Sequence, residues 1–379
     1  MKLPIYLDYN ATTPVDTQVL EAMLPWFSEQ FGNAASRTHL YGWEAQEAVE
    51  IARRQVADLL GASEKEIVFT SGATESNNLA IKGVFEAQAY RGKHLITVAT
   101  EHKAVLDTCK HVEQLGGEVT YLQPQADGLI RPEQVAEALR SDTLLVSVMM
   151  AHNEIGVIQP LAEIAALCHA KGVLFHTDAT QAVGKLPIDV QVQNIDLLSL
   201  SAHKLYGPKG IGALYVRKNV KLTAQLDGGG HERGRRSGTL NVPGIVGLGK
   251  ACEAAERLRT TEQVRLGALR DYLEQSLLAA LPACFVNGNT ASRLAHVTNM
   301  AFADVDGEQL LMNLKDIAVS SGSACTSASV EPSYVLKSLG VPDDLAYASV
   351  RFSLGRYTTE EQIQYAIKHV VEVVQAMRQ

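Results

Sequence analysis

A lysine and a cysteine, each in a predicted loop, are the two side chains of this sequence best suited to covalent chemistry. Lys204 lies shortly after the apolar run 197–200. A lysine carried into a loop among apolar strands has reason to show the lowered pKa that a Schiff-base amine requires, although most lysines are simply exposed. Cys325 lies in the stretch 320–329, which is built of small residues and has no apolar periodicity. Such a loop suits a reactive thiolate, and the alternative is a small buried cysteine in a tight turn.

Two further groups after apolar runs could hold a flat, phosphate-bearing ligand. The segment 71–76 reads Ser-Gly-Ala-Thr-Glu-Ser and precedes a predicted helix, whose first N–H groups and positive end suit a phosphate. A plain helix cap by Ser71 or Thr74 is the alternative. His102 could stack on a flat ligand or act as an acid or base, although a lone histidine is more often a cap or a core residue.

Asn153 and Asp178 follow two more apolar runs. Asn153 offers both a donor and an acceptor, and could equally be a turn residue. Asp178 could pair with a protonated ring nitrogen or a metal, or cap the next helix. Each signal is weak alone. Combined with Lys204, these groups supply a phosphate cradle, a stacking ring, an acid and an amine, and that set predicts pyridoxal phosphate as the cofactor, without a metal.

The elements that would position these residues alternate between helices and short apolar runs from about residue 44 to 250. A helical repeat over 49–59 is followed by Gly61, which is suited to end it. The strand candidates are 67–70, 95–99, 144–149, 173–175, 197–200 and 211–216. Most are continuous apolar runs, so we expect a mainly parallel sheet between helices. Ligands bind beyond the carboxyl ends of such strands, where Lys204 and its companions fall.

The pattern changes near residue 250. A long helical stretch, a strand, a helix, the Cys325 loop and a final helix follow, at 250–281, 297–302, 308–314, 320–329 and 359–377. We expect a large cofactor-binding α/β domain over 16–250 and a smaller α+β domain over 251–379 that carries the Cys325 loop. The N-terminal segment 1–15 is expected to pack with the small domain.

Composition excludes several classes of protein. The 379 residues carry a formal net charge of -8, which argues against a nucleic-acid partner, since that would need a basic face. The five cysteines include no CxxC pair, so a structural zinc site is not expected. Cys109 and Cys168 each share a helical face with apolar residues and are predicted to be inert. Without a signal peptide or an apolar run of about 20 residues, we expect a cytoplasmic protein with no membrane partner.

The segments around these residues resemble the cysteine desulfurases of the NifS/IscS type, which are pyridoxal-phosphate enzymes related to the class V aminotransferases. The likeness extends over essentially the full length. The matching segments are Tyr6 to Asp8 with Ala11 to Pro14, Ser71 to Asn77, Thr100 to His102, Asp178 to Gln181, His203 to Gly210, Arg236 to Thr239, Ser320 to Ser329 and Arg351 to Ser353. The cysteine segment is similar to the NifS/IscS branch rather than to the SufS or selenocysteine-lyase branch.

The resemblance implies a type I pyridoxal-phosphate-dependent transferase fold and a homodimer. It implies that sulfur is removed from L-cysteine, giving L-alanine and a persulfide on Cys325. The persulfide would pass to acceptors for iron–sulfur cluster assembly or tRNA thiolation. Lys204 would bind the cofactor, Asp178 would pair with its pyridine nitrogen, and His102 would stack on the ring and shuttle protons. The other implied contacts are Asn153 and Gln181 at the ring hydroxyl, Ala73, Thr74, Ser201 and His203 at the phosphate, Thr239 from the other subunit, and Arg351 with Asn33 at the substrate carboxylate.

The sequence departs from the family pattern at a few positions. Family members often have Asn where this chain has His152 and Pro where it has Ala34. Many relatives continue beyond the position of Gln379 with a tail that docks the iron–sulfur scaffold, so delivery by that route is expected less firmly than the chemistry. The alternatives are an aminotransferase of the same fold, a selenocysteine-lyase-like enzyme, and an inactive relative that only binds a sulfur acceptor.

Overall fold

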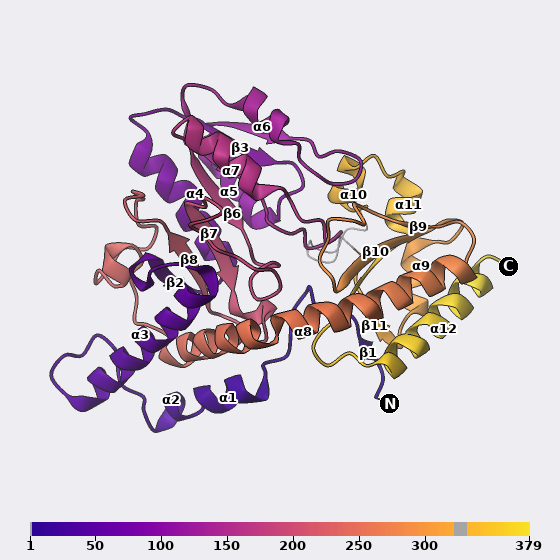
Figure 1. Ribbon diagram of the computed structural model, residues 1–379, viewed down its shortest axis with the longest axis horizontal. Coiled ribbons are helices and arrows are strands. Elements are labelled where there is room, and N and C mark those ends of the chain that lie inside the picture. Colours follow the sequence, from indigo (N-terminus) through magenta and orange to yellow (C-terminus); the bar gives the residue numbers. More distant parts are fainter. Residues whose placement is uncertain (1, 322–331) are drawn as a thin grey trace.

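The chain folds into two lobes, each with its own apolar core, and one long helix runs along both of them (Figure 1). The structure is a computed structural model, and it describes residues 2–321 and 332–379. The long helix, α8 (Val242–Ala280), packs its first half against the larger lobe and its second half against the smaller one.

A seven-stranded sheet forms the centre of the larger lobe, in the order β2-β8-β7-β6-β5-β3-β4. Its strands are β2 (Ile67–Thr70), β3 (His94–Val98), β4 (Glu118–Leu122), β5 (Thr143–Ser147), β6 (Leu174–Asp178), β7 (Leu197–Ser201) and β8 (Gly212–Val216). Only β8 is antiparallel to its neighbours. The carboxyl ends of β2, β3, β5, β6 and β7 therefore meet at one edge, as the sequence predicts for a mainly parallel sheet.

Helices cover both faces of this sheet, which confirms the predicted layers. They are α3 (Leu40–Leu60), α4 (Ala73–Gln88), α5 (Lys103–Gln114), α6 (Pro132–Ala138) and α7 (Leu161–Ala170). Helices α4 and α5 pack on one face, whereas α3, α7 and the start of α8 pack on the other. The expected strands omit β4, because this edge strand is only half-buried and lacks a continuous apolar run.

Helix α8 begins at Val242, several residues before the expected start near residue 250. Gly244, Gly247 and Gly249 weaken the helical signal in the sequence. The structure explains one of them directly, because a Cβ atom on Gly249 would lie 2.6 Å from the Cα of Ala52 in α3. The glycine thus allows the two helices to approach closely. Helix α3 itself ends, as predicted, at Gly61 with a φ of 65°.

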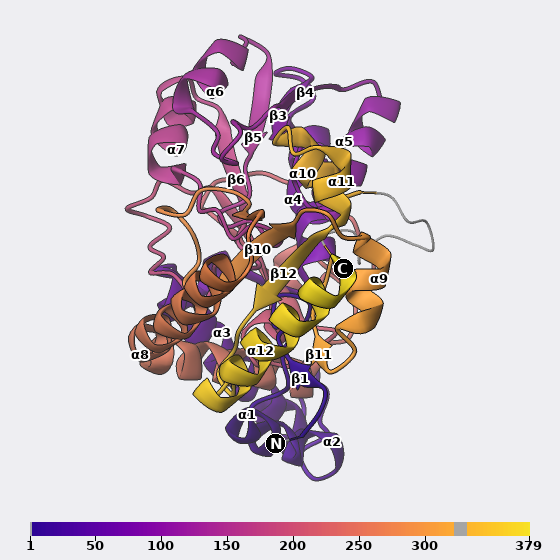
Figure 2. The ribbon, with the colours of Figure 1, turned by 90° about the vertical axis from the view of Figure 1, so that its right-hand side faces the viewer.

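The smaller lobe is built on a three-stranded antiparallel sheet, in the order β12-β10-β9. Its strands are β9 (Cys284–Val286), β10 (Val297–Phe302) and β12 (Ser349–Ser353), and its helices are α9 (Gly307–Asn313), α10 (Tyr334–Ser338), α11 (Asp343–Tyr347) and α12 (Glu360–Met377). Figure 2 shows α12 beside α8 in front of this sheet. Two short helices, α1 (Thr17–Met23) and α2 (Pro25–Ser28), precede α3 in the larger lobe.

The N-terminal segment contacts both lobes. Its first part forms β1 (Ile5–Tyr6), which pairs in parallel with β11 (Ile317–Ala318) of the smaller lobe. Further along, the backbone N–H of Thr13 donates to the carbonyl of His203 in the larger lobe, at 2.9 Å. The segment thereby crosses the junction between the lobes, next to the sheet edge where the predicted site lies. None of the helices in the described residues has the length and apolar character that crossing a bilayer requires.

Candidate active site

A cavity of about 510 Å³ opens at the edge where the parallel strands end. This volume lies within the range of small-molecule and cofactor sites, about 300–1,000 Å³. Its lining includes these residues predicted from the sequence: Ala73, Thr74, His102, Asn153, Asp178, Gln181, Ser201, His203, Lys204 and Arg351. Residues from five separate strand ends and from the smaller lobe therefore meet in one hollow.

Lys204 ends the short 3-10 helix η2 (Ala202–Lys204), directly after β7. Its Nζ donates to the backbone carbonyls of Asn10 and Ala11, at 2.5 and 2.6 Å. Sequence reasoning missed Asn10, whose buried side chain also joins the two lobes: its Nδ2 donates to the carbonyl of Asn153, and its Oδ1 pairs with Nε2 of His296. The N-terminal segment therefore positions the amine of the lysine.

Asp178 is the last residue of β6, and it is only 4% exposed. Its Oδ1 accepts from the backbone N–H of Thr180 at 3.0 Å, and its Oδ2 accepts from Nδ2 of Asn77 at 2.7 Å. Two hydrogen bonds hold the carboxylate in one orientation at the cavity wall. Asn77 did not appear among the predicted site residues. Its only sequence signal is its place in the first turns of α4, after Thr74.

The start of α4 has the geometry expected of a phosphate cradle. Gly72 precedes the helix with a φ of 152°, and no side chain of the described residues caps this helix end. The alternative considered from the sequence, a plain cap by Ser71 or Thr74, is therefore wrong. The first helical N–H groups have no acceptor within the helix, because that bonding begins with Ser76 donating to Gly72. Glu75 ties this turn to the segment between β8 and α8 through an ion pair with Arg236, at 2.8 Å.

His102 is the N-cap of α5 and lines the cavity. Its Nδ1 accepts from the backbone N–H of Ala104 at 3.1 Å. The neutral ring must then carry its hydrogen on Nε2, which is the atom left to exchange protons. His102 thus serves both as a helix cap, the alternative considered from sequence, and as part of the cavity wall.

Two other histidines near the site are held neutral. Burial lowers the pKa of His152 to about 4, and its Nε2 donates to the carbonyl of Thr100 at 2.8 Å. Burial, together with the positive charge of Lys204, also lowers the pKa of His203 to about 4. Nδ1 of His152 accepts from the backbone N–H of Glu154 at 3.0 Å, so the neutral ring orders the turn at Asn153 without adding charge.

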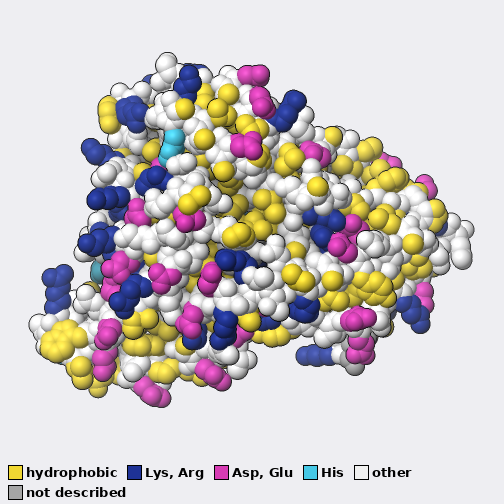
Figure 3. All heavy atoms as spheres, in the orientation of Figure 1, with side chains coloured by type: hydrophobic (Ala, Val, Ile, Leu, Met, Phe, Trp, Pro, Cys, Tyr) yellow, Lys and Arg dark blue, Asp and Glu magenta, His cyan; other side chains and the backbone are white. Residues whose placement is uncertain are grey.

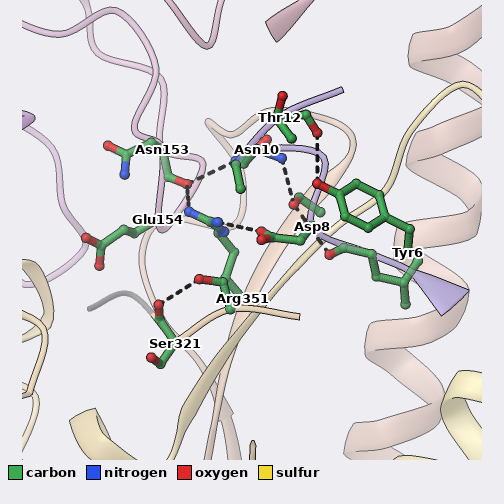
Figure 4. Close-up of polar contacts among 12 residues, drawn as sticks. Tyr6, Asp8, Asn10, Thr12, Asn153, Glu154, Ser321 and Arg351 are labelled. Carbon is green, nitrogen blue, oxygen red and sulfur yellow. Dashed lines mark hydrogen bonds and ion pairs between the residues drawn. The ribbon is translucent and has the colours of Figure 1, made fainter. Parts of the chain in front are cut away.

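Arg351 is buried in β12 and connects the smaller lobe to the cavity. Its Nη2 pairs with Oδ1 of Asp8 at 2.6 Å, and its Nη1 donates to the carbonyl of Asn153 at 3.0 Å. Figure 4 shows the guanidinium between these two partners, with the side-chain amide of Asn153 pointing away from them. The Nε atom is buried without a partner among the described residues. An acidic ligand at this arginine would share the guanidinium with Asp8.

Glu154, next to Asn153, is a buried carboxyl whose raised pKa should make the stability of the protein depend on pH. Ser333 donates to its Oε2 at 2.6 Å, and burial raises its pKa from 4.5 to about 7. Between these two pH values the native state holds a proton that the unfolded chain releases, so the free energy of unfolding falls as the pH rises and levels off above 7.

We expect Glu154→Gln to remove this pH-dependent loss of unfolding free energy, which amounts to about 3 kcal/mol between the two pKa values of Glu154. Relative to the wild type, the free energy of unfolding of the variant should therefore increase between pH 5 and 7.5. Urea unfolding at pH 5, 6 and 7.5 measures the difference. A difference that stays constant over this range would contradict the raised pKa of Glu154.

Three predicted residues do not line the cavity of the described chain. Asn33 is exposed, and its Oδ1 accepts from the backbone N–H of Ala35 at 2.9 Å. Thr239 is also exposed. Cys325 lies outside the described residues. The roles assigned to these three residues therefore stay predictions.

The four described cysteines are all buried. Burial raises the pKa of Cys109 and Cys168 to about 12 and that of Cys284 to about 11, and it also raises the pKa of Cys252. A buried thiol with a raised pKa carries little thiolate at neutral pH and reacts slowly. Cys109 and Cys168 are thus core residues, as predicted, and their inertness stays a prediction.

The cavity fits a flat ring that carries a phosphate. Buried polar atoms near it have no partner in the described part of the chain, namely Oγ1 of Thr180 and Oδ1 of Asn77. The helix start at Ala73, the fixed carboxylate of Asp178 and the amine of Lys204 lie around the same hollow. These groups would fit the phosphate, the ring nitrogen and the aldehyde carbon of pyridoxal phosphate.

The fold and this cavity place the chain in the class of proteins with the type I pyridoxal-phosphate-dependent transferase fold. Within that class, the chain belongs to the aminotransferase class-V family, whose model matches residues 5–366. The use of pyridoxal phosphate is a general property of this family.

The chain is similar to proteins named "Cysteine desulfurase IscS". It is 58% identical to the one from Anaeromyxobacter dehalogenans (strain 2CP-C) and 59% identical to the one from Tolumonas auensis (strain DSM 9187 / NBRC 110442 / TA 4). Both alignments cover all of this chain and 94% of the relative.

Solved structures of similar proteins support the same family assignment. A protein titled "NIFS-LIKE PROTEIN" has a TM-score of 0.93 and 37% identity, with 99% of this chain and 100% of that chain covered. Another, titled "SspA in complex with cysteine", has a TM-score of 0.83 and 41% identity, with 94% and 100% covered. The predicted resemblance to NifS/IscS-type cysteine desulfurases is confirmed.

Proposed function

We propose that the chain is a cysteine desulfurase that converts L-cysteine to L-alanine and transfers the sulfur to Cys325. The observation that carries this proposal is the cavity in which the amine of Lys204 and the guanidinium of Arg351 face the same space. An amine to react at the α-carbon and a cation to hold the α-carboxylate are what an amino-acid substrate requires. The full-length likeness to proteins named cysteine desulfurase supports L-cysteine as that substrate.

Pyridoxal phosphate would be held by the start of α4 at its phosphate, by Asp178 at its ring nitrogen and by Lys204 through a covalent bond. Gln181 and Asn153 are proposed at the ring hydroxyl, and Ser201 with His203 at the phosphate. When bound, the cofactor supplies an electron-withdrawing ring that stabilises negative charge on the α-carbon of the amino acid. A carboxylate at the ring nitrogen keeps that nitrogen protonated and strengthens the withdrawal.

Lys204 is the proposed base for the proton on the substrate α-carbon. Hydrogen bonds from Nζ to the carbonyls of Asn10 and Ala11 hold the amine at the cavity that it lines together with Arg351. An amine that takes up the α-proton can return a proton at the same place. The two carbonyls therefore fix the position from which the lysine exchanges protons.

Arg351 and His102 complete the proposed handling of the substrate. The unpartnered Nε of Arg351 is a donor for the α-carboxylate, and Asp8 with the carbonyl of Asn153 keeps the guanidinium in place. His102 presents Nε2 for protons that enter or leave near the ring, because its Nδ1 is bound to Ala104. Asn33 is proposed as a further contact of the carboxylate.

The sulfur step uses the thiolate of Cys325. The thiolate attacks the substrate sulfur, a new S–S bond forms, and the C–S bond of the substrate breaks, with its electron pair remaining on carbon. That carbon takes up a proton and leaves as alanine. Cysteine and one enzyme thiol thus give alanine and one enzyme persulfide, with no outside oxidant or reductant.

The described residues that flank the cysteine segment lie against this site. Ser320 pairs with Arg351, whose N–H donates to its carbonyl at 2.8 Å. On the far side, Ser333 donates to Glu154. Cys325 lies four residues beyond Ser321, and four residues span up to about 14 Å. Both flanking anchors therefore support the proposed role of Cys325 at this cavity.

A homodimer is proposed because apolar side chains gather on the surface around α2 and the start of α3. Phe27, Phe31 and Trp43 are 61%, 65% and 53% exposed, and Leu40 and Tyr41 lie beside them. Figure 3 shows hydrophobic atoms at this lower left end of the molecule. Exposed apolar patches of this kind mark contact surfaces.

We infer that the second subunit brings Thr239 to the phosphate. The persulfide is proposed to pass to an iron–sulfur scaffold or a tRNA-thiolation protein. A cytoplasmic location is proposed because free thiols persist in reducing compartments.

The test is an assay of the purified holoprotein with L-cysteine and a reductant. We expect alanine and sulfide in equal amounts, and no effect of adding 2-oxoglutarate. A keto acid that appears only with 2-oxoglutarate would instead identify an aminotransferase. Turnover restricted to L-selenocysteine would identify a selenocysteine lyase, and no visible chromophore in any preparation would favour an inactive relative.

A further inference from the structure

Lys185 is an amine near the site that the proposed mechanism does not use. Its amino group is buried at a second, small cavity of about 40 Å³ behind the first, although part of the residue is exposed. Lys204 lines both cavities, whereas Gln181 lines only the larger one. Burial and the charge of Lys204 lower the pKa of Lys185 to about 7. A lysine amine is costly to bury, so its partners indicate what it does there.

The partner of Lys185 is a residue of the cavity wall. Its Nζ donates to Oε1 of Gln181 at 3.1 Å. On the other side of the same amide, Nε2 of Gln181 donates to the carbonyl of Asn10 at 2.9 Å. That carbonyl is also one of the two that hold Lys204. A continuous chain of hydrogen bonds thus runs from Lys185 through Gln181 and Asn10 to Lys204.

These partners determine which way the amide of Gln181 faces. A backbone carbonyl only accepts, so the side that faces Asn10 must be the NH₂ group. Lys185 donates, so the opposite side must be the oxygen. The amide oxygen is thereby turned toward Lys185, and the second hydrogen of Nε2 is the group that Gln181 has left for a ligand in the larger cavity.

We propose that Lys185 is a positioning residue that locks the amide of Gln181, so that Gln181 presents an N–H donor to the oxygen on the bound cofactor ring. The proposal rests on the proposed function, which puts the ring hydroxyl at Gln181. A donor at this oxygen stabilises its ionised form, whereas a reversed amide would present an acceptor and repel it. Lys185 does not line the larger cavity, and it acts through Gln181.

Other charged and titratable groups face Lys185 in the small cavity and have to stay constant in any test. They are Lys204 from η2, Arg259 and Glu262 from α8, His296 before β10, Arg356 after β12, and the phenols of Tyr9 and Tyr206. The guanidinium of Arg356 is paired with both Glu262 and Asp16. Replacing Lys185 alone leaves these pairs intact.

The experiment is a pH titration of the visible absorbance of the holoenzyme. Lys185→Met keeps the length of the stem and removes the donor. We expect the variant to stay coloured, because Lys204 is intact. The pH at the midpoint of its absorbance titration should rise by about one unit, which corresponds to the loss of one hydrogen bond to a charged group. Lys171→Met, at an exposed lysine after α7, is the matched control and should leave the midpoint unchanged.

A double-mutant cycle separates positioning from a direct effect of the charge. In a Gln181→Ala background, Lys185→Met should cause no further shift, because the residue through which it acts is gone. An equal shift in both backgrounds, or no shift in the single variant, would overturn the proposal. Lys185→Leu gives the same comparison should the Met variant fail to fold. A colourless wild type would instead count against the proposed cofactor.

Discussion

Lys204→Ala is expected to lose the yellow absorbance of the holoenzyme and to lower alanine formation by about 10³-fold or more, because one residue supplies both the covalent link and the base. The carbonyls of Asn10 and Ala11 are fixed in the backbone and cannot replace the amine that they hold. The absorbance spectrum and an alanine assay with L-cysteine measure the two losses separately.

Lys209 provides the matched control for Lys204. It lines the same cavity, but it lies outside the short helix that places Lys204 against the N-terminal segment. Lys209→Ala should keep its colour. Borohydride reduction followed by peptide mapping identifies the linked lysine, and a linkage retained at another lysine of the Lys204→Ala variant would refute the assignment.

Cys325→Ala is expected to have the opposite signature, with full colour and no sulfur transfer. Lys204, Asp178 and the start of α4 are unchanged in this variant, so the cofactor should bind normally. Without an attacking thiolate the C–S bond of the substrate is not broken, and both persulfide and alanine should fall to background, again by about 10³-fold or more. Alkylation-based persulfide detection and an alanine assay report the two products.

Cys284→Ala is the control for loss of a thiol. Cys284 is buried in β9 with a raised pKa, and it does not line the cavity. Its replacement should leave sulfur transfer intact. Normal alanine production by Cys325→Ala would remove Cys325 from the mechanism while leaving the assignment of Lys204 untouched.

The strands and their chemistry were predictable because parallel strands buried on both faces need continuous apolar runs, and functional side chains follow those runs. Strands β2 and β10 match the expected bounds, and β7 matches them within one residue. The half-exposed edge strand β4 and the glycine-rich start of α8 have weak local signals, since partners elsewhere in the chain stabilise them.

The residues that hold the reactive groups were not predictable in the same way. Asn10 joins Asn153, His296 and Lys204 through contacts that span more than a hundred residues of chain, and nothing in its local sequence indicates them. Asp8 at Arg351 is likewise a partner across elements. Such pairs arise only when two lobes and an N-terminal segment meet.

The sequence by itself determined the class of fold, and it singled out Lys204, Asp178 and Cys325 as the candidate reactive residues, because their chemistry is a property of residue type at a strand end or in a loop. The tertiary structure alone decided how the lysine amine is held, which ring nitrogen of His102 carries the hydrogen, and how Arg351 shares its guanidinium with Asp8. Those features depend on distances between atoms far apart in the chain, and hydrogen bonds act only over about 3 Å.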